Sequence, residues 1–484
     1  MPRLPQPLLL SPRWLGPVVV ALGLTACASA PSMVTEPEMP VHLAEVAGWR
    51  ATSPTAEAGA LVQWWRVFQD DDLAGLIERS LEVHTSVRSA QAALAQARAQ
   101  RDVTAAATLP AVRASGSAQR SATGEVTAAN AFRAGLDASW ELDVFGARRS
   151  ALAASEAEVR SSAAQLGQAR VTLAAEVALT YVEWRAQQQR LQVARDNLAL
   201  QEASLQLTRW RVEAGLASQL DLAQALAAVG QTRAAVAPLE SGVQQNRNAL
   251  AVLVGLAPQA ELDLREGAEV PQAALTLAMG IPADTLRQRP DIQVAEARVM
   301  AAVARVAQAD ATRYPGFSVG GSLDWRSPRL ADLFDTGVLT RALVASVSAS
   351  LWDGGAARAQ VSAQAAALEQ ARVSLEVAMV NALQEVETAL LALQASRLRL
   401  DHLADAAAAA IQAETLARHR HAGGLIDTRA LLDAQRARLN AESDLSTARA
   451  SWSTDHVRLY KALGGGWSRD TLIKDLEVSL HEPR

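Results

Sequence analysis

Lysine and cysteine are almost absent from this chain of 484 residues. Only Lys461 and Lys474 are lysines, so arginine supplies nearly all of the positive charge and lysine-dependent chemistry has almost nowhere to occur. The net charge of −5 argues against a nucleic-acid-binding protein, which usually carries a basic face. Charged residues make up 20% of the chain and hydrophobic residues 50%, which is typical of a folded protein and not of a disordered one.

The single cysteine, Cys27, cannot form an intrachain disulfide or anchor a multi-cysteine metal site. A basic start and the apolar run 14–24 precede it, and this run is too short to span a bilayer. Leu24-Thr25-Ala26-Cys27 resembles the lipobox of bacterial lipoproteins, in which a signal peptide is removed and the cysteine is lipidated. We therefore expect residues 1–26 to be a signal peptide, although an ordinary secretory signal with a chance cysteine is the alternative. Ala28 in place of aspartate favours the outer membrane, by analogy with lipoprotein sorting.

Long apolar runs are also lacking after Cys27, where no stretch of 18 apolar residues occurs. A transmembrane helix is therefore not expected in the mature chain. Any part that spans a membrane must then be a closed β-barrel, because every backbone group there needs an internal partner. Residues 27–60 are rich in Ala, Pro, Thr and Glu and are predicted to be a tether from the lipid anchor.

The hydrophobic period changes from helix to strand near Pro110. An alanine-rich helix is predicted over about 84–109 and is stopped by Pro110. Apolar and polar residues then alternate clearly over 131–142 and more weakly over 111–120, which indicates a β-hairpin with one apolar and one polar face.

A very long helix is predicted next, over about 147–212. Apolar residues recur every seven positions and no proline interrupts the run, so the helix would be roughly 100 Å long and must pack along neighbours of similar length. Gly215-Leu216 turns the chain into a return helix over 219–256, in which Pro238 is expected to introduce a kink.

The chain then repeats this unit. Gly215-Leu216 recurs 209 residues later as Gly424-Leu425, and Glu176-Val177 recurs at the same offset as Glu385-Val386. We assign repeat 1 to residues 61–270 and repeat 2 to residues 271–463. Repeat 2 is predicted to contain a helix over 289–313, strands over 316–326 and 341–352, and long helices over 356–421 and 427–463.

Two hairpins give four strands, whereas a membrane barrel needs at least about eight. Either several chains share one barrel or the strands are not in a membrane. Trp140, Trp325 and Trp352 lie near predicted strand ends, where an interfacial aromatic girdle would fall, although simple core packing is the alternative.

These features together resemble the TolC-like outer-membrane efflux factor family, in its lipoprotein branch from RND-type tripartite systems. The resemblance covers nearly all of the mature chain. Its motifs, each weak alone but specific in this order, are Trp64-Trp65 with Phe68 and Asp70, Trp140-Glu141-Leu142-Asp143 with Phe145-Gly146, Arg289-Pro290-Asp291-Ile292, Leu351-Trp352-Asp353-Gly354-Gly355, Leu431-Leu432-Asp433-Ala434-Gln435-Arg436 and Leu463-Gly464-Gly465-Gly466-Trp467.

The resemblance implies an α+β membrane protein that forms a homotrimer. Each chain would give four strands to one β-barrel, which a long periplasmic α-helical barrel continues, and residues 464–484 would belong to a mixed equatorial belt. The implied partners are a periplasmic adaptor (membrane fusion protein), an inner-membrane RND pump and outer-membrane lipid, with no nucleic acid. The implied role is passive conduction of drugs or other small molecules across the outer membrane. We expect no catalysis and no cofactor besides the covalent lipid on Cys27.

The resemblance also implies two kinds of site near the helix-hairpin turns. Gly215, Leu216, Gly424 and Leu425 would be adaptor-docking tips, although glycine also simply ends a helix. Asp221, His421 and Asp433 would form the periplasmic gate, with His421 in place of an aromatic residue and Ala430 in place of a second acidic one. A ring of three Asp433 side chains would favour cations, whereas solvated helix charges are the alternative. His419 and His421 are two residues apart and so do not share a helix face, which excludes a metal pair.

Three other functions fit parts of the sequence. A duct for type I protein secretion has the same fold, but lipidation and the Arg-Pro-Asp motif favour drug efflux. A lipid-anchored periplasmic coiled-coil scaffold explains Cys27 and the heptads, yet leaves the amphipathic hairpins without a purpose. An enzyme is least favoured, because no nucleophile, base and acid occur together in a recognisable motif.

Overall fold

The computed structural model describes residues 61–122, 124, 128–265, 267, 269–273, 288–335 and 339–468, all within a single unit that covers residues 39–484. The expected signal peptide (1–26), the lipidated Cys27, the tether and most of the C-terminal tail lie outside the described residues. No helix in the described ranges is both long enough and apolar enough to cross a membrane.

Three short elements open the described chain: the 3-10 helix η2 (Trp64–Phe68), α4 (Asp71–Val83) and α5 (Thr85–Ala106). The Asp70 side chain caps α4 by accepting from the backbone N–H groups of Asp72 and Leu73. His84 is extended (φ −67°, ψ 140°) and separates α4 from α5, which begins at Thr85, next to the predicted start of the alanine-rich helix at about residue 84.

Four strands form one antiparallel sheet in the order β1-β2-β3-β4, with β1 at Ala111–Ser121, β2 at Ala129–Leu142, β3 at Gly316–Ser327 and β4 at Leu339–Ser348. The central β2–β3 pairing joins the two repeats, because Leu136 lies opposite Leu323. Arg133 and Asp324, on the polar face, form an ion pair of 2.7 Å across this pairing.

The prediction that the last strand reaches residue 352 was wrong. β4 ends at Ser348, which pairs with Gly316, the first residue of β3, so no partner strand remains beyond that point. Trp352 therefore lies outside the sheet and is 89% exposed. Trp140, by contrast, donates its indole N–H to the carbonyl oxygen of Thr108 (3.0 Å), which ties β2 to the end of the α5 segment.

The long helices repeat with equal lengths. α6 (Ala147–Glu213) and α10 (Ala356–Ala422) have 67 residues each, and α7 (Gln219–Leu253) and α11 (Thr428–Ala462) have 35 each. α10 starts 209 positions after α6 (356 and 147), and α11 starts 209 positions after α7 (428 and 219). Pro238 lies inside α7, which continues on both sides of it. The shorter helix α9 (Pro290–Ala311) precedes β3.

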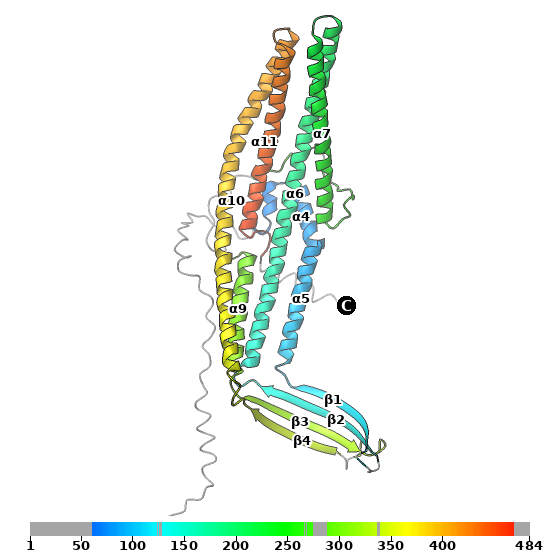
Figure 1. Ribbon diagram of the computed structural model, residues 1–484, viewed down its shortest axis with the longest axis vertical. Helices are drawn as coiled ribbons and strands as arrows, with labels where there is room; N and C mark the ends of the chain where they lie inside the picture. The colour runs from blue at the N-terminus through cyan, green and yellow to red at the C-terminus, as the bar shows by residue number, and fades with distance from the viewer. Residues whose placement is uncertain are drawn as a thin grey trace, which may run out of the picture. The chain divides into compact units, whose positions relative to one another are not determined.

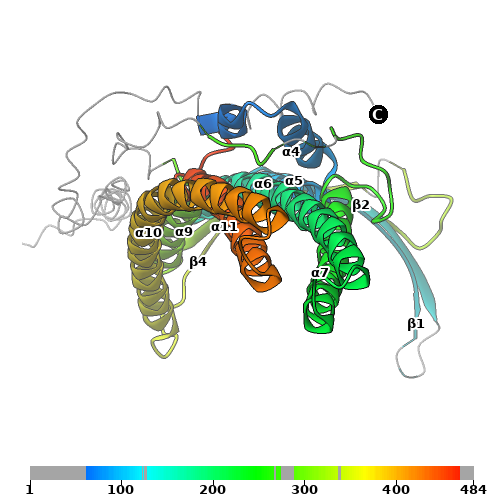
Figure 2. The same ribbon diagram turned by 90° about the horizontal axis from the view of Figure 1, so that it is seen from above.

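The long helices lie side by side in the order α10, α11, α6 and α7, in a curved layer with α4 on its convex side (Figures 1 and 2). In chain order each pair of strands lies between a shorter helix, α5 or α9, and a long one, α6 or α10. In space the sheet lies at one end of the helical layer and the helix-hairpin turns lie at the other (Figure 1). The largest apolar core forms where η2 and α4 pack on α6, around Trp64, Leu73 and Val177. The core therefore fixes the middle of α6 and leaves the turns far from it.

Candidate functional site at the hairpin tips

The two hairpin tips have the same backbone geometry. Gly215 (φ +69°) and Gly424 (φ +73°) adopt the left-handed conformation that favours glycine. The N–H of Leu216 donates to the Arg211 carbonyl (2.7 Å), and the N–H of Leu425 donates to that of Arg420 (2.9 Å). Both bonds close the end of a long helix in the manner of a Schellman motif. Leu216 and Leu425 are 79% and 77% exposed, so each tip presents an apolar side chain to solvent.

Asp221 caps its own helix. Its carboxylate accepts hydrogen bonds from the backbone N–H (3.0 Å) and the hydroxyl (2.7 Å) of Ser218, while its own N–H donates to the Ser218 hydroxyl oxygen (3.2 Å). This reciprocal capping box satisfies helix-end donors. The bonds from Ser218 lower the pKa of the Asp221 carboxyl below its usual value, and Thr428 and His421 lower it further.

His421 is buried at the junction between the two tips. Only 4% of the residue is exposed, and its Nε2 atom lies 3.4 Å from the Thr428 hydroxyl and 3.4 Å from a guanidinium nitrogen of Arg211. Burial and the Arg211 charge lower the pKa of this imidazole, against the opposite effect of Asp221 and Asp427. The residues around His421 therefore come from three other helices and one helix cap: Arg211 from α6, Asp221 from α7, Thr428 from α11, and Asp427 from the cap of α11.

Asp433 lies apart from this junction in the single chain. Its side chain is 62% exposed and lies 3.9 Å from Arg436, one turn along the same helix. The structure thus brings Asp221 and His421 into one cluster and leaves Asp433 as a solvated charge on α11. Sequence reasoning missed Arg211 and Thr428, and no local signal marks them, because the Arg211–His421 contact joins residues 210 positions apart.

The two hairpins meet along α6 and α11 through hydrogen bonds. The Asn197 side chain donates to the Gln435 carbonyl (3.3 Å), and the Gln435 side chain donates to the Ser204 hydroxyl (3.3 Å). Further from the tips, the Ser446 hydroxyl donates to the Ala186 carbonyl (3.4 Å). These directional contacts fix how far α11 is displaced along α6.

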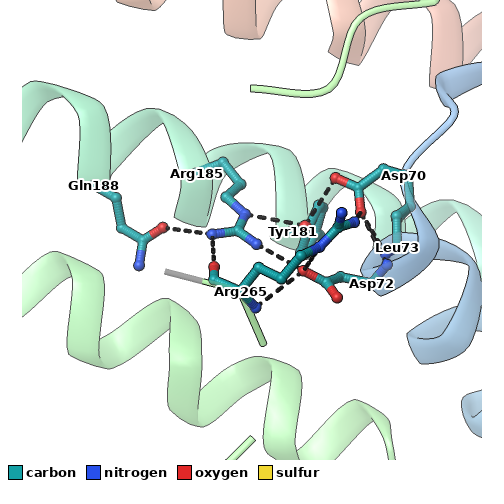
Figure 3. Close-up of polar contacts among 7 residues, drawn as sticks. All are labelled: Asp70, Asp72, Leu73, Tyr181, Arg185, Gln188 and Arg265. Atoms are coloured by element: carbon teal, nitrogen blue, oxygen red, sulfur yellow. Dashed lines mark hydrogen bonds and ion pairs between the residues drawn. The ribbon is translucent and has the colours of Figure 1, made fainter. Parts of the chain in front are cut away.

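A second polar cluster, far from the tips, fixes α4 and the segment after α7 on α6 (Figure 3). Arg185 is fully buried, and its guanidinium bonds to Asp72 (3.0 Å), the Tyr181 hydroxyl (3.0 Å) and the Arg265 carbonyl (2.7 Å). The Tyr181 hydroxyl in turn donates to Asp70 (2.9 Å). Burial and the nearby Asp70 charge raise the pKa of Tyr181, so it stays protonated as a donor.

The Arg-Pro-Asp motif forms a third polar cluster. Arg289 pairs with Asp291 and Glu385 (both 2.7 Å) and donates to the Ala462 carbonyl (2.6 Å) at the end of α11. Three helices are thereby tied at one point. This cluster and the one around Arg185 hold helices together. Among the described residues, no group of three or more His, Cys, Asp or Glu side chains is placed to hold a metal ion.

The fold is that of outer-membrane efflux channels. The structure of the outer-membrane channel OprN matches with a TM-score of 0.79 and 31% identity, over 90% of this chain and 98% of that one. The Campylobacter jejuni CmeC outer membrane channel matches with a TM-score of 0.83, over 94% and 98% of the two chains, and at 21% identity it supports the fold alone.

Sequence comparison leads to the same family. The probable efflux pump outer membrane protein TtgC of Pseudomonas putida is 33% identical over 96% of this chain and 98% of its own length. The outer membrane protein OprJ of Pseudomonas aeruginosa is 30% identical over 93% and 95% of the two chains. The family model described as "Outer membrane efflux protein" matches residues 76–256 and 281–465. The chain belongs to this outer membrane efflux protein family, which confirms the resemblance, the fold class and the outer-membrane location inferred from the sequence.

Proposed function

We propose that the chain is the outer-membrane channel subunit of a tripartite RND-type efflux system and conducts small molecules passively out of the periplasm. The single observation that carries this proposal is the match along almost the whole chain to TtgC, whose name describes an efflux pump outer membrane protein. The internal duplication supports it, since two hairpins of strands continue into two hairpins of long helices. The clusters described above hold helices together, and we propose no catalytic step and no cofactor.

The channel is proposed to be a homotrimer. A sheet of four strands leaves β1 and β4 as edges with unpaired backbone groups, which proteins normally pair or cover. Val112 on β1 is 70% exposed and Leu343 on β4 is 83% exposed. Twelve strands from three chains would close one barrel and remove these edges, as membrane barrels require.

The tips are proposed to contact a periplasmic adaptor, which would connect the channel to the inner-membrane pump. The exposed Leu216 and Leu425, which follow the turn glycines, supply apolar contacts at that end. Asp221 and His421 are proposed to hold the periplasmic gate together. Asp433 would face its copies in a ring of three and favour cations. Cys27 is proposed to carry the covalent lipid that anchors the chain in the outer membrane.

The decisive test for drug efflux is accumulation of a fluorescent cation such as ethidium in cells that lack this gene. We expect accumulation to rise in these cells and to return to the original level when the full chain is restored. The same cultures are assayed for secreted protein. Unchanged ethidium accumulation together with loss of a secreted protein would contradict drug efflux and favour the type I secretion duct.

A further inference from the structure

Arg211 at the end of α6 reaches across to the end of α10. Its Nη2 atom donates to the carbonyl oxygens of His421 (3.1 Å) and Ala422 (3.2 Å). These carbonyls lie in the last turn of α10, where a helix leaves its C=O groups without intrahelical partners; that of His421 also accepts from the Gly424 N–H (3.0 Å) in the turn. A positive charge is also favoured at this helix end by the macrodipole. One side chain therefore joins repeat 1 to repeat 2 at the tips.

The contact between the Arg211 guanidinium and His421 depends on whether the imidazole is protonated. Arginine has only N–H donors, so the Nε2 atom that lies 3.4 Å from Arg211 can bond to it only as an acceptor, while the Thr428 hydroxyl, also 3.4 Å away, can donate or accept. An acceptor at Nε2 requires a neutral imidazole with its proton on Nδ1. Protonation would place two cations in direct contact, at a site where His421 is almost fully buried.

The charges that face His421 come from every element packed against it. Arg211 contributes from α6, Asp221 from the first turn of α7, and Asp427 from the cap of α11. On α10 itself the adjacent His419 and Arg420 are exposed to solvent. Burial and Arg211 outweigh the two carboxylates, so the pKa of His421 is lower than the usual 6.5.

We infer that Arg211 and neutral His421 form a proton-sensitive clamp, which ties α6 to α10 at the tips and is released when His421 is protonated. Arg211 is thus a positioning residue that acts on α10. This inference rests on the proposed function only where it identifies the tips with the periplasmic entrance of the channel.

The direction of the pH effect follows from proton binding. Opening the clamp would remove the burial and the Arg211 contact that lower the pKa of His421 from 6.5, whereas the closed form resists protonation to lower pH. The closed clamp therefore keeps its full stability above pH 6.5 and loses it as the pH falls below that value. Acidification of the periplasmic side is expected to loosen the tips.

Hydrogen exchange of the full-length protein in detergent micelles tests the clamp directly. Peptides that cover residues 205–225 and 415–430 are followed at pH 7.5 and pH 5.5, after correction for intrinsic exchange rates. We expect the wild type to lose about tenfold in protection at pH 5.5. His421→Gln, whose amide oxygen accepts from Arg211 at any pH, should keep its protection at both values. Arg211→Gln should be unprotected at both.

Matched controls exist on the same helix end. Arg420→Gln changes the residue that occupies the position of Arg211 in repeat 2, and His419→Gln removes an exposed imidazole two residues from His421. Both should behave as the wild type. Equal pH dependence in the wild type and His421→Gln would overturn the clamp, and so would a control that matches Arg211→Gln.

Single-channel conductance at the same two pH values separates this inference from the proposed function. Conductance that rises at low pH in the wild type and not in His421→Gln would support both. Exchange that responds as expected in a protein that never conducts would leave the clamp standing and would contradict the channel.

Discussion

The two helical hairpins share one backbone plan but differ inside. In the first hairpin, Leu205, Ala225 and Val229 form an apolar cluster between α6 and α7. At the offset of 209, the second hairpin places Glu414, Ala434 and Arg438 at these positions. Glu414 is fully buried, and its carboxylate pairs with Arg438 at 3.2 Å.

This difference shows that the duplicated geometry does not depend on an apolar inner layer. Both hairpins keep the same helix lengths, 67 and 35 residues, although one is closed by aliphatic contacts and the other by an ion pair. A buried ion pair adds little net stability compared with apolar residues of similar size, but it penalises every arrangement that leaves one charge alone. We therefore infer that Glu414 and Arg438 fix the register of the second hairpin.

The repeats differ again where the rest of the chain covers them. Tyr181 and Arg185 anchor α4 and the segment after α7 on α6. The equivalent positions on α10 are Leu390 and Gln394, and Gln394 is exposed. The polar anchor is therefore specific to repeat 1, and α4 and the segment after α7 are bound to α6 and not to α10.

Removal of the anchor should have the largest effect on stability. Arg185→Met removes the buried cation that joins Asp72, Tyr181 and the Arg265 carbonyl and leaves Asp72 with only the exposed Arg265, at 3.2 Å. It should lower the free energy of unfolding by about 3 kcal/mol. Thermal unfolding followed by circular dichroism at 222 nm measures the loss. Gln394→Met at the equivalent position of repeat 2 is the matched control and should be close to neutral. Equal effects of the two substitutions would refute the difference between the repeats.

Exchange of the inner layers should have a smaller effect. Arg438→Val alone leaves buried Glu414 with only the more distant Arg418, at 3.9 Å, and should cost about 3 kcal/mol. The double variant Glu414→Leu with Arg438→Val copies the first hairpin and should be within about 1 kcal/mol of the wild type, or more stable. A double-mutant cycle in the same unfolding assay gives the coupling between the two residues. Strict additivity of the two single losses would show that Glu414 and Arg438 are not coupled and do not fix the register of the second hairpin as a pair.

The sequence predicts the repeated elements well because their information is local. The seven-residue period predicts α6 over 147–212, and the structure has Ala147–Glu213. It misses features that depend on partners. β4 stops at Ser348 because β3 offers no residue beyond Gly316.

The site was only partly predictable for the same reason. The tip glycines were predicted from the turn and its repetition, and Asp221 and His421 from the family resemblance. The resemblance did not show that Asp221 caps α7 through Ser218, nor that Arg211 contacts His421. Periodicity identifies which face of a helix is apolar, but it does not identify which polar side chain on another helix that face will meet.

Conductance in planar bilayers tests most directly whether this chain forms a passive channel. The purified full-length protein, shown by circular dichroism to be folded, should give discrete ion-conducting steps. Asp433→Ala should raise the step size, because it removes the proposed acidic ring; an unchanged step would discard that ring alone. Folded protein that inserts into the bilayer and gives no steps would contradict the channel.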